Sequence, residues 1–242
     1  MRAFAQPARD RLRRRQEDVV AEQVRALTDI LNRGDVLYLA PEGLISPDGW
    51  LQAFRSGLRQ ILACAEAPVR LLPACIVDDF MRPGRLKVHL TMGEEMEASA
   101  GPPAAVGAAV RRSIAALHAM TTSQVISQTV WTAVGGGREA LATGGLIAAT
   151  RERVAALRSA GLRVDDDLVG AGVSGLLTNW TRYVARKGYA TPGAGEVRFD
   201  VARIVATPVT HWENPIRYCV NEVQSVLAAL ASSPVAVETV SP

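Results

Sequence analysis

Glu42 and Gly43 are the residues of this sequence whose types and position best suit chemistry on a ligand. They follow a short apolar run, residues 37–40, that stops at Pro41, which is typical of a buried strand running into a functional loop. Glycine lets an anion approach backbone N–H groups closely, and a carboxylate can accept hydrogen bonds from a hydroxylated substrate. The same carboxylate could equally brace the loop, cap a helix or pair with a surface arginine.

A polar turn and two further motifs follow this loop. The turn is Asp48-Gly49, the next motif is Phe54-Arg55-Ser56-Gly57, and the last is Leu72-Pro73-Ala74-Cys75-Ile76. Together with Ala40-Pro41-Glu42-Gly43-Leu44-Ile45-Ser46 they resemble the glycerolipid acyltransferase family, which acylates glycerol 3-phosphate and lysophosphatidic acid. That family has a Phe-Pro-Glu-Gly-Thr-Arg-Ser loop, an Asp-Gly turn, a Phe-Lys-x-Gly motif and an apolar strand with an internal proline. The four elements stand in the same order here, and the resemblance hardly extends into the second half of the chain.

The resemblance implies transfer of a fatty-acyl group from an acyl thioester to a glycerophosphate or lysophospholipid hydroxyl. The donor would be acyl-CoA or an acyl carrier protein, and no metal, cofactor or covalent intermediate is implied. The family's Glu and Gly lie at its glycerol-phosphate site, which assigns substrate binding to Glu42 and Gly43, and Ser46 matches the family's Ser. Leu44 and Ile45 stand where the family has Thr-Arg, so either the phosphate is held elsewhere or the acceptor differs.

A second phosphate-binding arginine lies upstream of this loop in the family. The spacing here points to the cluster at residues 11–15, with Arg13 or Arg14 nearest. Residues 1–15 contain six arginines against one acid, Asp10. Because arginine can hold phosphate with two parallel hydrogen bonds, Arg13 and Arg14 are the expected phosphate ligands. Composition alone favours a frayed, solvated terminus for the same segment.

The family's catalytic base is a His that takes the proton of the acceptor hydroxyl, and an Asp separated from it by four residues orients the imidazole. The chain has His89, His118 and His211, and none has an Asp at that spacing. His89 has Glu94 there, but it follows the loop instead of preceding it. We therefore assign no catalytic residue to this chain and expect it to be inactive alone. A misplaced start, a truncated copy or a site completed by another chain would each explain the missing motif.

A non-catalytic lipid-binding or interaction protein that kept the same fold is the alternative, and a plain helical interaction module is the third reading. Other chemistries have weaker support. The sequence lacks a Gly-x-Ser-x-Gly nucleophile elbow, a phosphate-binding P-loop and a His/Cys cluster spaced for zinc.

Composition is compatible with a folded protein in a reducing compartment. The 242 residues are 48% hydrophobic and 21% charged, with a net charge of +3 and a pI of about 9.0. This mild basicity suits an anionic lipid surface or a phosphorylated substrate, does not demand nucleic acid, and is also compatible with ordinary surface charge. Three scattered cysteines indicate buried thiols. With no 18-residue apolar run and no apolar secretory segment, we expect a cytoplasmic protein, with peripheral contact at the inner face of the membrane as a further expectation.

Hydrophobic periodicity predicts an α/β domain over residues 1–102, a partial acyltransferase-type sheet flanked by helices. Helices are predicted at residues 17–33 and 50–65, with Gly34 ending the first, and strands at residues 36–40, 69–77 and 86–92. The apolar run at residues 69–77 suggests burial on both faces, as in a parallel sheet. In residues 86–92 the apolar side chains alternate with polar ones, which predicts two different faces.

A mainly helical accessory region is predicted over residues 103–232, after a polar boundary at residues 93–103. Its expected elements are helices at residues 104–119, 138–160 and 165–187, a short strand at residues 197–201, and a helix capped by Asn214 with Pro215 at its first position. Residues 233–242 are expected to be a disordered tail.

Overall fold

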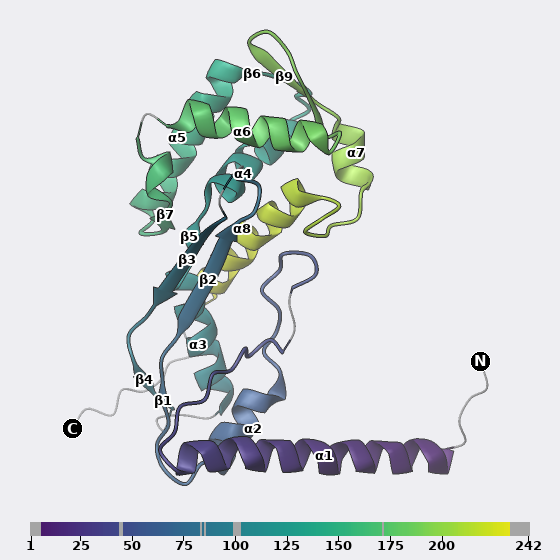
Figure 1. Ribbon diagram of the computed structural model, residues 1–242, viewed down its shortest axis with the longest axis vertical. Helices are drawn as coiled ribbons and strands as arrows, with labels where there is room; N and C mark the ends of the chain where they lie inside the picture. The colour runs from purple at the N-terminus through teal and green to yellow at the C-terminus, as the bar shows by residue number, and fades with distance from the viewer. Residues whose placement is uncertain are drawn as a thin grey trace.

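The chain folds into a mixed α/β structure in which small sheets are set among helices (Figure 1). The computed structural model describes residues 6–43, 46–82, 84, 86–98, 103–170 and 172–232. The described elements of the first half are α1 (Gln6–Asn32), α2 (Ser56–Cys64), β1 (Arg70–Leu71), β2 (Ala74–Asp79), β3 (Lys87–Met92) and β4 (Met96–Glu97). Those of the second half are α3 (Pro103–Leu117), β5 (Ala119–Met120), α4 (Thr122–Gly135), β6 (Ala140–Ala142), α5 (Thr143–Ser159), β7 (Arg163–Val164), the 3-10 helix η2 (Asp166–Leu168), α6 (Val173–Arg186), β8 (Ala190–Pro192), β9 (Glu196–Phe199), α7 (Val201–Ala206) and α8 (Pro215–Ala231).

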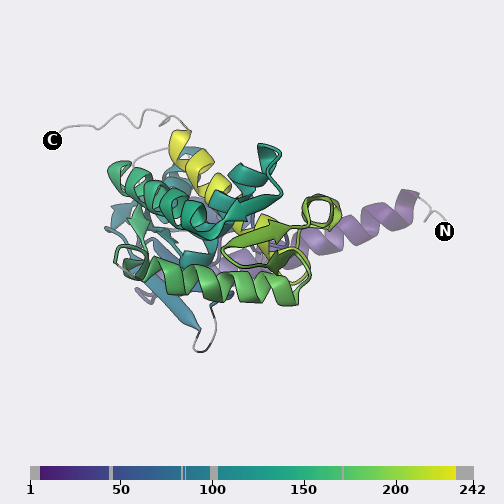
Figure 2. The same cartoon turned by 90° about the horizontal axis from the view of Figure 1, so that it is seen from above.

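Helix α1 is longer than its sequence pattern predicts, because the arginine-rich segment from Gln6 onward is helical. It ends as expected at Gly34, whose φ of +82° lets Asp35 donate its N–H back to the carbonyl of Ile30 at 3.1 Å. Among the described elements α1 packs mainly on α2, and its N-terminal half projects away from the rest of the molecule (Figures 1 and 2). The frayed terminus expected for the first fifteen residues is therefore wrong for residues 6–15, and residues 1–5 lie outside the described part.

The strand predicted at residues 36–40 does not form. These residues have no regular secondary structure, no described strand pairs with their backbone, and Val36 and Tyr38 are 94% and 80% exposed. An apolar run records a preference for extended backbone, whereas a strand also needs a neighbour to complete its hydrogen bonds. The helix predicted at residues 50–65 begins only at Ser56, because the segment before it belongs to the preceding loop.

The strands β2 and β3 form an antiparallel hairpin, whereas the apolar run at residues 69–77 suggested a strand buried on both faces, as in a parallel sheet. Their register pairs Ile76 with Leu90 and Asp78 with Val88, and the short β1–β4 ladder continues the same arm beyond Pro73 and Gly93. The run in β2 is buried on one face only, where Cys75 and Val77 pack with Leu117 of α3. The predicted alternation in β3 is confirmed, but its apolar side faces outward, because the polar side meets acidic groups of the second half.

The second half is helical, as predicted, and holds the main cores. Helix α4 begins with a capping box, in which Thr121 and Gln124 satisfy each other's backbone N–H groups, and packs along α8. Helix α8 begins as predicted, with Asn214 as the N-cap and Pro215 in the first turn. One core gathers around Trp180, whose indole N–H donates to Ser127 Oγ at 3.2 Å, and a second gathers around Met120.

Two helices of the second half are shorter than predicted. The segment at residues 138–160 starts as strand β6, which pairs with β9 in a three-stranded antiparallel sheet, and only then becomes α5. The segment at residues 165–187 forms the short η2, whose N-cap is Asp165, and α6 begins only at Val173, after Gly170 and Gly172. The carboxylates of Asp165 and Asp167 also bind Lys87 of the hairpin. The short strand predicted at residues 197–201 is present as β9.

Contacts cross the boundary predicted near residue 102. The strand β2 packs on α3 and α4, and the loop at residues 46–52 bonds to α3 and α8. None of the helices in the described part is both long and apolar enough to cross a membrane. The predicted tail at residues 233–242 lies outside the described residues.

Candidate functional site

The Pro41-Glu42-Gly43 segment forms a tight turn, although no strand precedes it. The N–H of Gly43 donates to the carbonyl of Ala40 at 3.0 Å, and Gly43 has a left-handed φ of +68°. One carboxylate oxygen of Glu42, Oε2, accepts the backbone N–H of Gln52 at 2.6 Å. The other, Oε1, has no hydrogen-bond partner in the described part of the chain. The turn thus uses the Gly43 N–H internally and leaves one oxygen of Glu42 available.

Arg55 lies directly beside this turn. Its backbone N–H donates to the carbonyl of Pro41 at 2.8 Å, and its Cγ lies 3.1 Å from the position that a Cβ on Gly43 would take. Its guanidinium forms no ion pair with a described residue. Arg55 is also the N-cap of α2, and no side chain caps that helix end. Uncapped N–H groups at a helix N-terminus favour anions. The side chain of Arg55 and the N-terminus of α2 are therefore two positive groups beside the turn.

Arg111 of α3 adds a third positive group near the turn. Its Nη2 donates to the carbonyl of Leu51 at 2.9 Å, and its buried Nε has no partner among the described residues. Burial raises the pKa of Glu42, and the Gln52 N–H and the charge of Arg111 oppose that rise. The turn therefore holds a half-buried carboxylate that is influenced by the positive charge of Arg111.

Ser46 and Asp48 hold the shape of the loop instead of facing a ligand. The hydroxyl of Ser46 donates to the carbonyl of Trp50 at 2.8 Å, and Asp48 Oδ1 accepts the N–H of Trp50 at 3.2 Å. Such bonds are typical of polar turns. The Ser46 hydroxyl thus uses its proton inside the loop, and only its acceptor lone pairs are left for the predicted substrate-binding role. Leu44 and Ile45 lie outside the described residues.

Helix α8 fastens this loop from the far end of the chain. Asn221 Nδ2 donates to the carbonyl of Asp48 at 2.8 Å, and the hydroxyl of Tyr218 lies 3.5 Å from the carbonyl of Ser46. Gly49 lies so close that an added Cβ would be 2.4 Å from the carbonyl oxygen of Tyr218. The second half of the chain thus positions the loop of the first.

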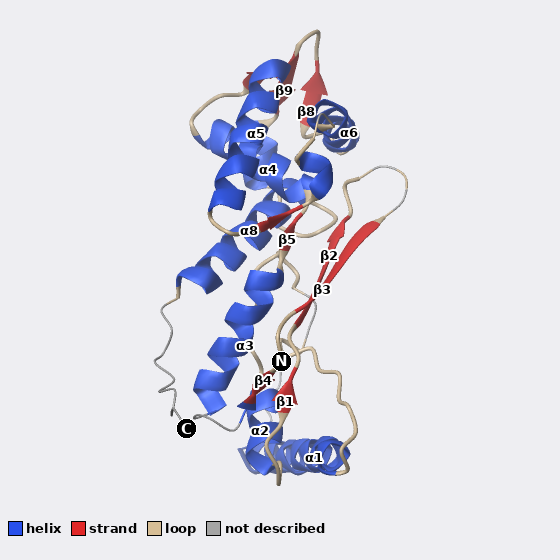
Figure 3. Cartoon of the chain, turned by 90° about the vertical axis from the view of Figure 1, so that its left-hand side faces the viewer, coloured by secondary structure: helices blue, strands red, loops and turns tan. Residues whose placement is uncertain are grey.

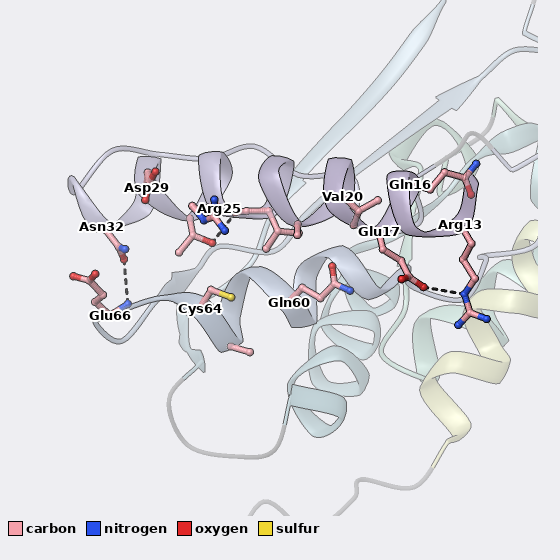
Figure 4. Close-up of a pocket in the computed structure, with 14 residues that line it drawn as sticks. Arg13, Gln16, Glu17, Val20, Arg25, Asp29, Asn32, Gln60, Cys64 and Glu66 are labelled. Carbon is pink, nitrogen blue, oxygen red and sulfur yellow. Dashed lines mark hydrogen bonds and ion pairs between the residues drawn. The ribbon is translucent and has the colours of Figure 1, made fainter. Parts of the chain in front are cut away.

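The predicted phosphate ligands Arg13 and Arg14 are not brought to this loop. Both lie on α1, where Arg13 Nε pairs with Glu17 at 2.9 Å, and neither forms a hydrogen bond or ion pair with residues 41–43 or 46. Arg13 instead lines a groove of about 950 Å³ between α1 and α2, with Val20, Val24 and Cys64 among its other walls (Figure 4). Glu42, Gly43 and Ser46 are not part of that groove.

His89 belongs to an ionic cluster on the inner side of the hairpin. Its Nε2 lies 3.4 Å from Asp165 Oδ2, and Lys87 Nζ donates to Asp165 at 2.5 Å and to Asp167 at 2.7 Å. Arg82 also pairs with Asp167, and together these cations lower the pKa of Asp167 to about 2. The carboxylate of Asp165 is fully buried, so the cluster fastens the hairpin to η2.

The other two histidines also have structural partners. His118, which follows α3, contacts Gln124 Oε1 through Nε2 at 3.0 Å, and burial lowers its pKa. The ring of His211 contacts that of Phe80 at a tilt of 54°, with centroids 3.9 Å apart, and lies beside Tyr218. Burial lowers the pKa of His211, and the charge of Asp78 opposes that shift. Through Tyr218, His211 is connected to the loop at Ser46, but none of the three histidines bonds to Glu42 or Gly43.

Sequence patterns missed three residues of this site. Arg55 belongs to the motif Phe54-Arg55-Ser56-Gly57, so a basic side chain close to the loop could have been predicted from the sequence. Arg111 and Asn221 come from helices whose patterns say nothing about the loop they contact. Within the described residues, no group of His, Cys, Asp and Glu side chains is arranged to hold a metal ion.

No family model, no curated protein and no solved structure matches this chain.

Proposed function

We propose that this protein binds a glycerophosphate-type acceptor at Glu42 and Arg55, in the manner of the glycerolipid acyltransferases that its loop resembles. The observation that carries the proposal is that Arg55, at the uncapped N-terminus of α2, lies beside the turn that holds the half-buried carboxylate of Glu42. Among the described residues, Glu42 Oε1 has no hydrogen-bond partner and the Arg55 guanidinium has no ion pair. Arg55 suits the phosphate of a phosphorylated polyol, and Glu42 suits one of its hydroxyl groups. The reaction served by the site would be acyl transfer from an acyl thioester to the acceptor hydroxyl.

In the proposed complex the phosphate lies against Arg55 and the first N–H groups of α2. Arginine and a helix N-terminus both favour a dianion, and the Nε of Arg111 is a further donor nearby. A hydroxyl of the glycerol donates to Glu42 Oε1. Gly43 supports this arrangement by leaving room for the Arg55 side chain. Peripheral membrane contact through the basic end of α1 remains a proposal of the same kind.

A non-catalytic binding protein is the second candidate, and a specific observation favours it. Each histidine is engaged elsewhere, with Asp165, with Gln124 or in the aromatic cluster, and none contacts the acceptor turn. Acyl transfer needs a base near the acceptor hydroxyl. We therefore expect the 242-residue protein alone to bind the acceptor without turnover, and a second chain could supply the base.

Calorimetric titration of the purified protein with sn-glycerol 3-phosphate tests the binding site. Glu42→Gln and Arg55→Gln should each weaken binding by about tenfold or more, because each removes a charge-assisted hydrogen bond. Arg158→Gln, an exposed arginine at the end of α5, is the matched control and should leave the affinity unchanged. Binding that neither loop variant weakens would contradict the proposed site, as would no binding at millimolar ligand.

Release of free CoA from an acyl-CoA in the presence of glycerol 3-phosphate separates the two candidate functions. Binding without CoA release supports the non-catalytic reading. Transfer that survives both His89→Ala and His211→Ala would show that the account of the missing base is wrong.

A further inference from the structure

The outer face of the β2–β3 hairpin is apolar and uncovered. Paired residues of the two strands share one face, and this face carries Ile76 opposite Leu90, with Val88 and Met92 beside them. Each of its large apolar side chains is between 51% and 63% exposed: Leu72, Ile76, Leu86, Val88, Leu90 and Met92. We call these six residues the hairpin face. Soluble monomers rarely expose so continuous an apolar patch.

The opposite face of the same hairpin is fully engaged. Cys75 and Val77 pack on α3, and Lys87 and His89 reach Asp165. Figure 3 shows the hairpin at one side of the molecule, with α3 and α8 on its inner side and no described helix over its outer side. A two-stranded sheet is marginal with one packed face, so a covering layer on the other face would stabilise it.

The size of the hairpin face fits association between proteins. Six side chains of this kind, each about half exposed, offer roughly 600 Å², against about 800 Å² for each partner in a specific complex. The neighbouring residues would add the remaining rim. Two flat apolar sheets can pack face to face at about 10 Å, as in a sandwich, and a two-fold axis brings the same patch of a second copy opposite the first.

The charges around the hairpin face disfavour an anionic lipid surface as its cover. Asp78 is exposed on the same face, paired with Val88, and Glu94 and Glu95 are exposed just beyond β3. Lys87, the basic residue of β3, lies on the other face in its bonds to Asp165 and Asp167. Surfaces that dock on anionic lipid carry basic residues around their apolar centre.

We infer that the hairpin face is an isologous interface, on which the β2–β3 hairpins of two copies of this chain pack face to face. The six residues of the hairpin face form the centre of each half. This association does not depend on the acceptor turn, which lies on other elements.

Sedimentation velocity of the purified full chain between 1 and 100 µM tests the interface. The wild-type protein should sediment as a concentration-dependent dimer. Leu90→Asp and Ile76→Asp should each raise the dimer dissociation constant at least tenfold, because they place a charge in the centre of the apolar contact. Both side chains are exposed in the single chain, so the circular dichroism of the variants should match that of the wild type, as should their thermal unfolding at concentrations where the wild type is monomeric.

Val205→Asp is the matched control, because Val205 is a 55% exposed apolar residue on α7, away from the hairpin. It should leave the dimer intact. A wild-type monomer over the whole concentration range would overturn the inference, and so would a dimer that both hairpin variants leave unchanged. Flotation with phosphatidylserine vesicles that is lost in Leu90→Asp, together with a monomeric wild type, would assign the face to lipid instead.

Discussion

Gly49 is the residue on which the position of the loop at residues 46–52 most directly depends. Its φ is +83°, in a region that other residues seldom adopt, and its Cα faces the carbonyl oxygen of Tyr218. A Cβ would lie 2.4 Å from that oxygen, which is backbone and cannot turn aside. Any side chain at this position must therefore push the loop away from α8.

We predict that Gly49→Ala lowers the free energy of unfolding by about 2–4 kcal/mol, from backbone strain together with the clash. Gly34→Ala is the control, because Gly34 has nearly the same φ, +82°, and no atom within 4 Å of the added Cβ. It should cost about 1–2 kcal/mol from strain alone. Urea unfolding followed by circular dichroism measures both, and equal losses would show that the loop can move freely from α8.

The sequence was informative where residues of the candidate site are neighbours in the chain. Glu42, Gly43 and Asp48-Gly49 are adjacent in the chain, so a turn with a carboxylate could be predicted from them. The placement of Arg13 and Arg14 at the same site failed, because α1 runs away from the loop and no local signal encodes that direction. Arg111 and Asn221 reach the loop only through tertiary packing.

At the scale of elements, the ionic cluster joins strand β3 to the 3-10 helix η2. The carboxylate of Asp165 accepts a hydrogen bond from the ammonium of Lys87 and lies near His89. The backbone N–H of Asp165 donates to the carbonyl of Met120 at 2.9 Å. The carboxylate is completely buried, and its partners Lys87 and His89 come from β3, in the first half of the chain. On the inner side of the hairpin, Asp165 is thus the most deeply buried member of a cluster that also includes Asp167.

Asp165→Ala should lower the free energy of unfolding by about 3–5 kcal/mol, because it leaves a partly buried ammonium without its closest counter-charge. The neighbouring Asp166 is exposed, so Asp166→Ala should change the stability by less than about 0.5 kcal/mol. Thermal denaturation followed by circular dichroism compares the two variants. Similar melting temperatures for both would contradict a structural role for the cluster.

This cluster also explains why two elements were predicted incorrectly. Three aspartates before an apolar stripe predict a helix N-terminus, and an alternating strand predicts apolar residues inside. Lys87 and His89 face inward because Asp165 and Asp167 bind Lys87 and Asp165 lies beside His89. The same aspartates belong to η2, and α6 begins further along the chain. Neither half of this arrangement is visible without the other.

At the scale of the whole molecule, a buried polar chain runs from the end of α3 through α4 to α8. His118 contacts Gln124, and Gln124 Nε2 donates to Glu222 Oε2 at 3.0 Å. Burial, with the charges of Asp78 and Asp79, raises the pKa of Glu222 to about 8, against the effect of the Gln124 bond. The folded protein therefore keeps a proton on Glu222 at neutral pH.

Stability should consequently fall as pH rises from 6.5 to 8. Over this range the unfolded chain has already lost the Glu222 proton, which leaves near pH 4.5, while the folded protein still holds it, so unfolding releases a proton. The slope attributable to this group is at most about 1.4 kcal/mol per pH unit. His118 and His211 act in the opposite direction, since their lowered pKa values make stability rise with pH, but only up to about 6.5.

Glu222→Gln retains an acceptor for Gln124 and should flatten the pH dependence over this range. Urea unfolding at pH 6.5, 7.2 and 8 measures the slope for both proteins. Parallel slopes would show that Glu222 does not carry the proton.

The general class of the whole fold could be predicted from the sequence, and its assembly could not. The helical second half, the Asn214 cap and the end of α1 at Gly34 were predicted correctly, because capping and periodicity act over a few residues. The strand predicted at residues 36–40 does not form, and the apolar face of β3 points outward. Both outcomes depend on neighbouring segments, since a strand needs a partner for its backbone hydrogen bonds and its buried face is the one that another element covers.

The basic end of α1 also gives the molecule a strong electric asymmetry. Residues 1–15 carry a formal charge of +5, whereas the whole chain carries +3, so the remaining 227 residues together are slightly negative. Helix α1 carries residues 6–15 of this segment away from that negative body. The protein is therefore an electric dipole with its positive pole on a projecting arm. Within a Debye length of about 8 Å in physiological salt, any anionic surface exerts a torque that turns this arm toward it first.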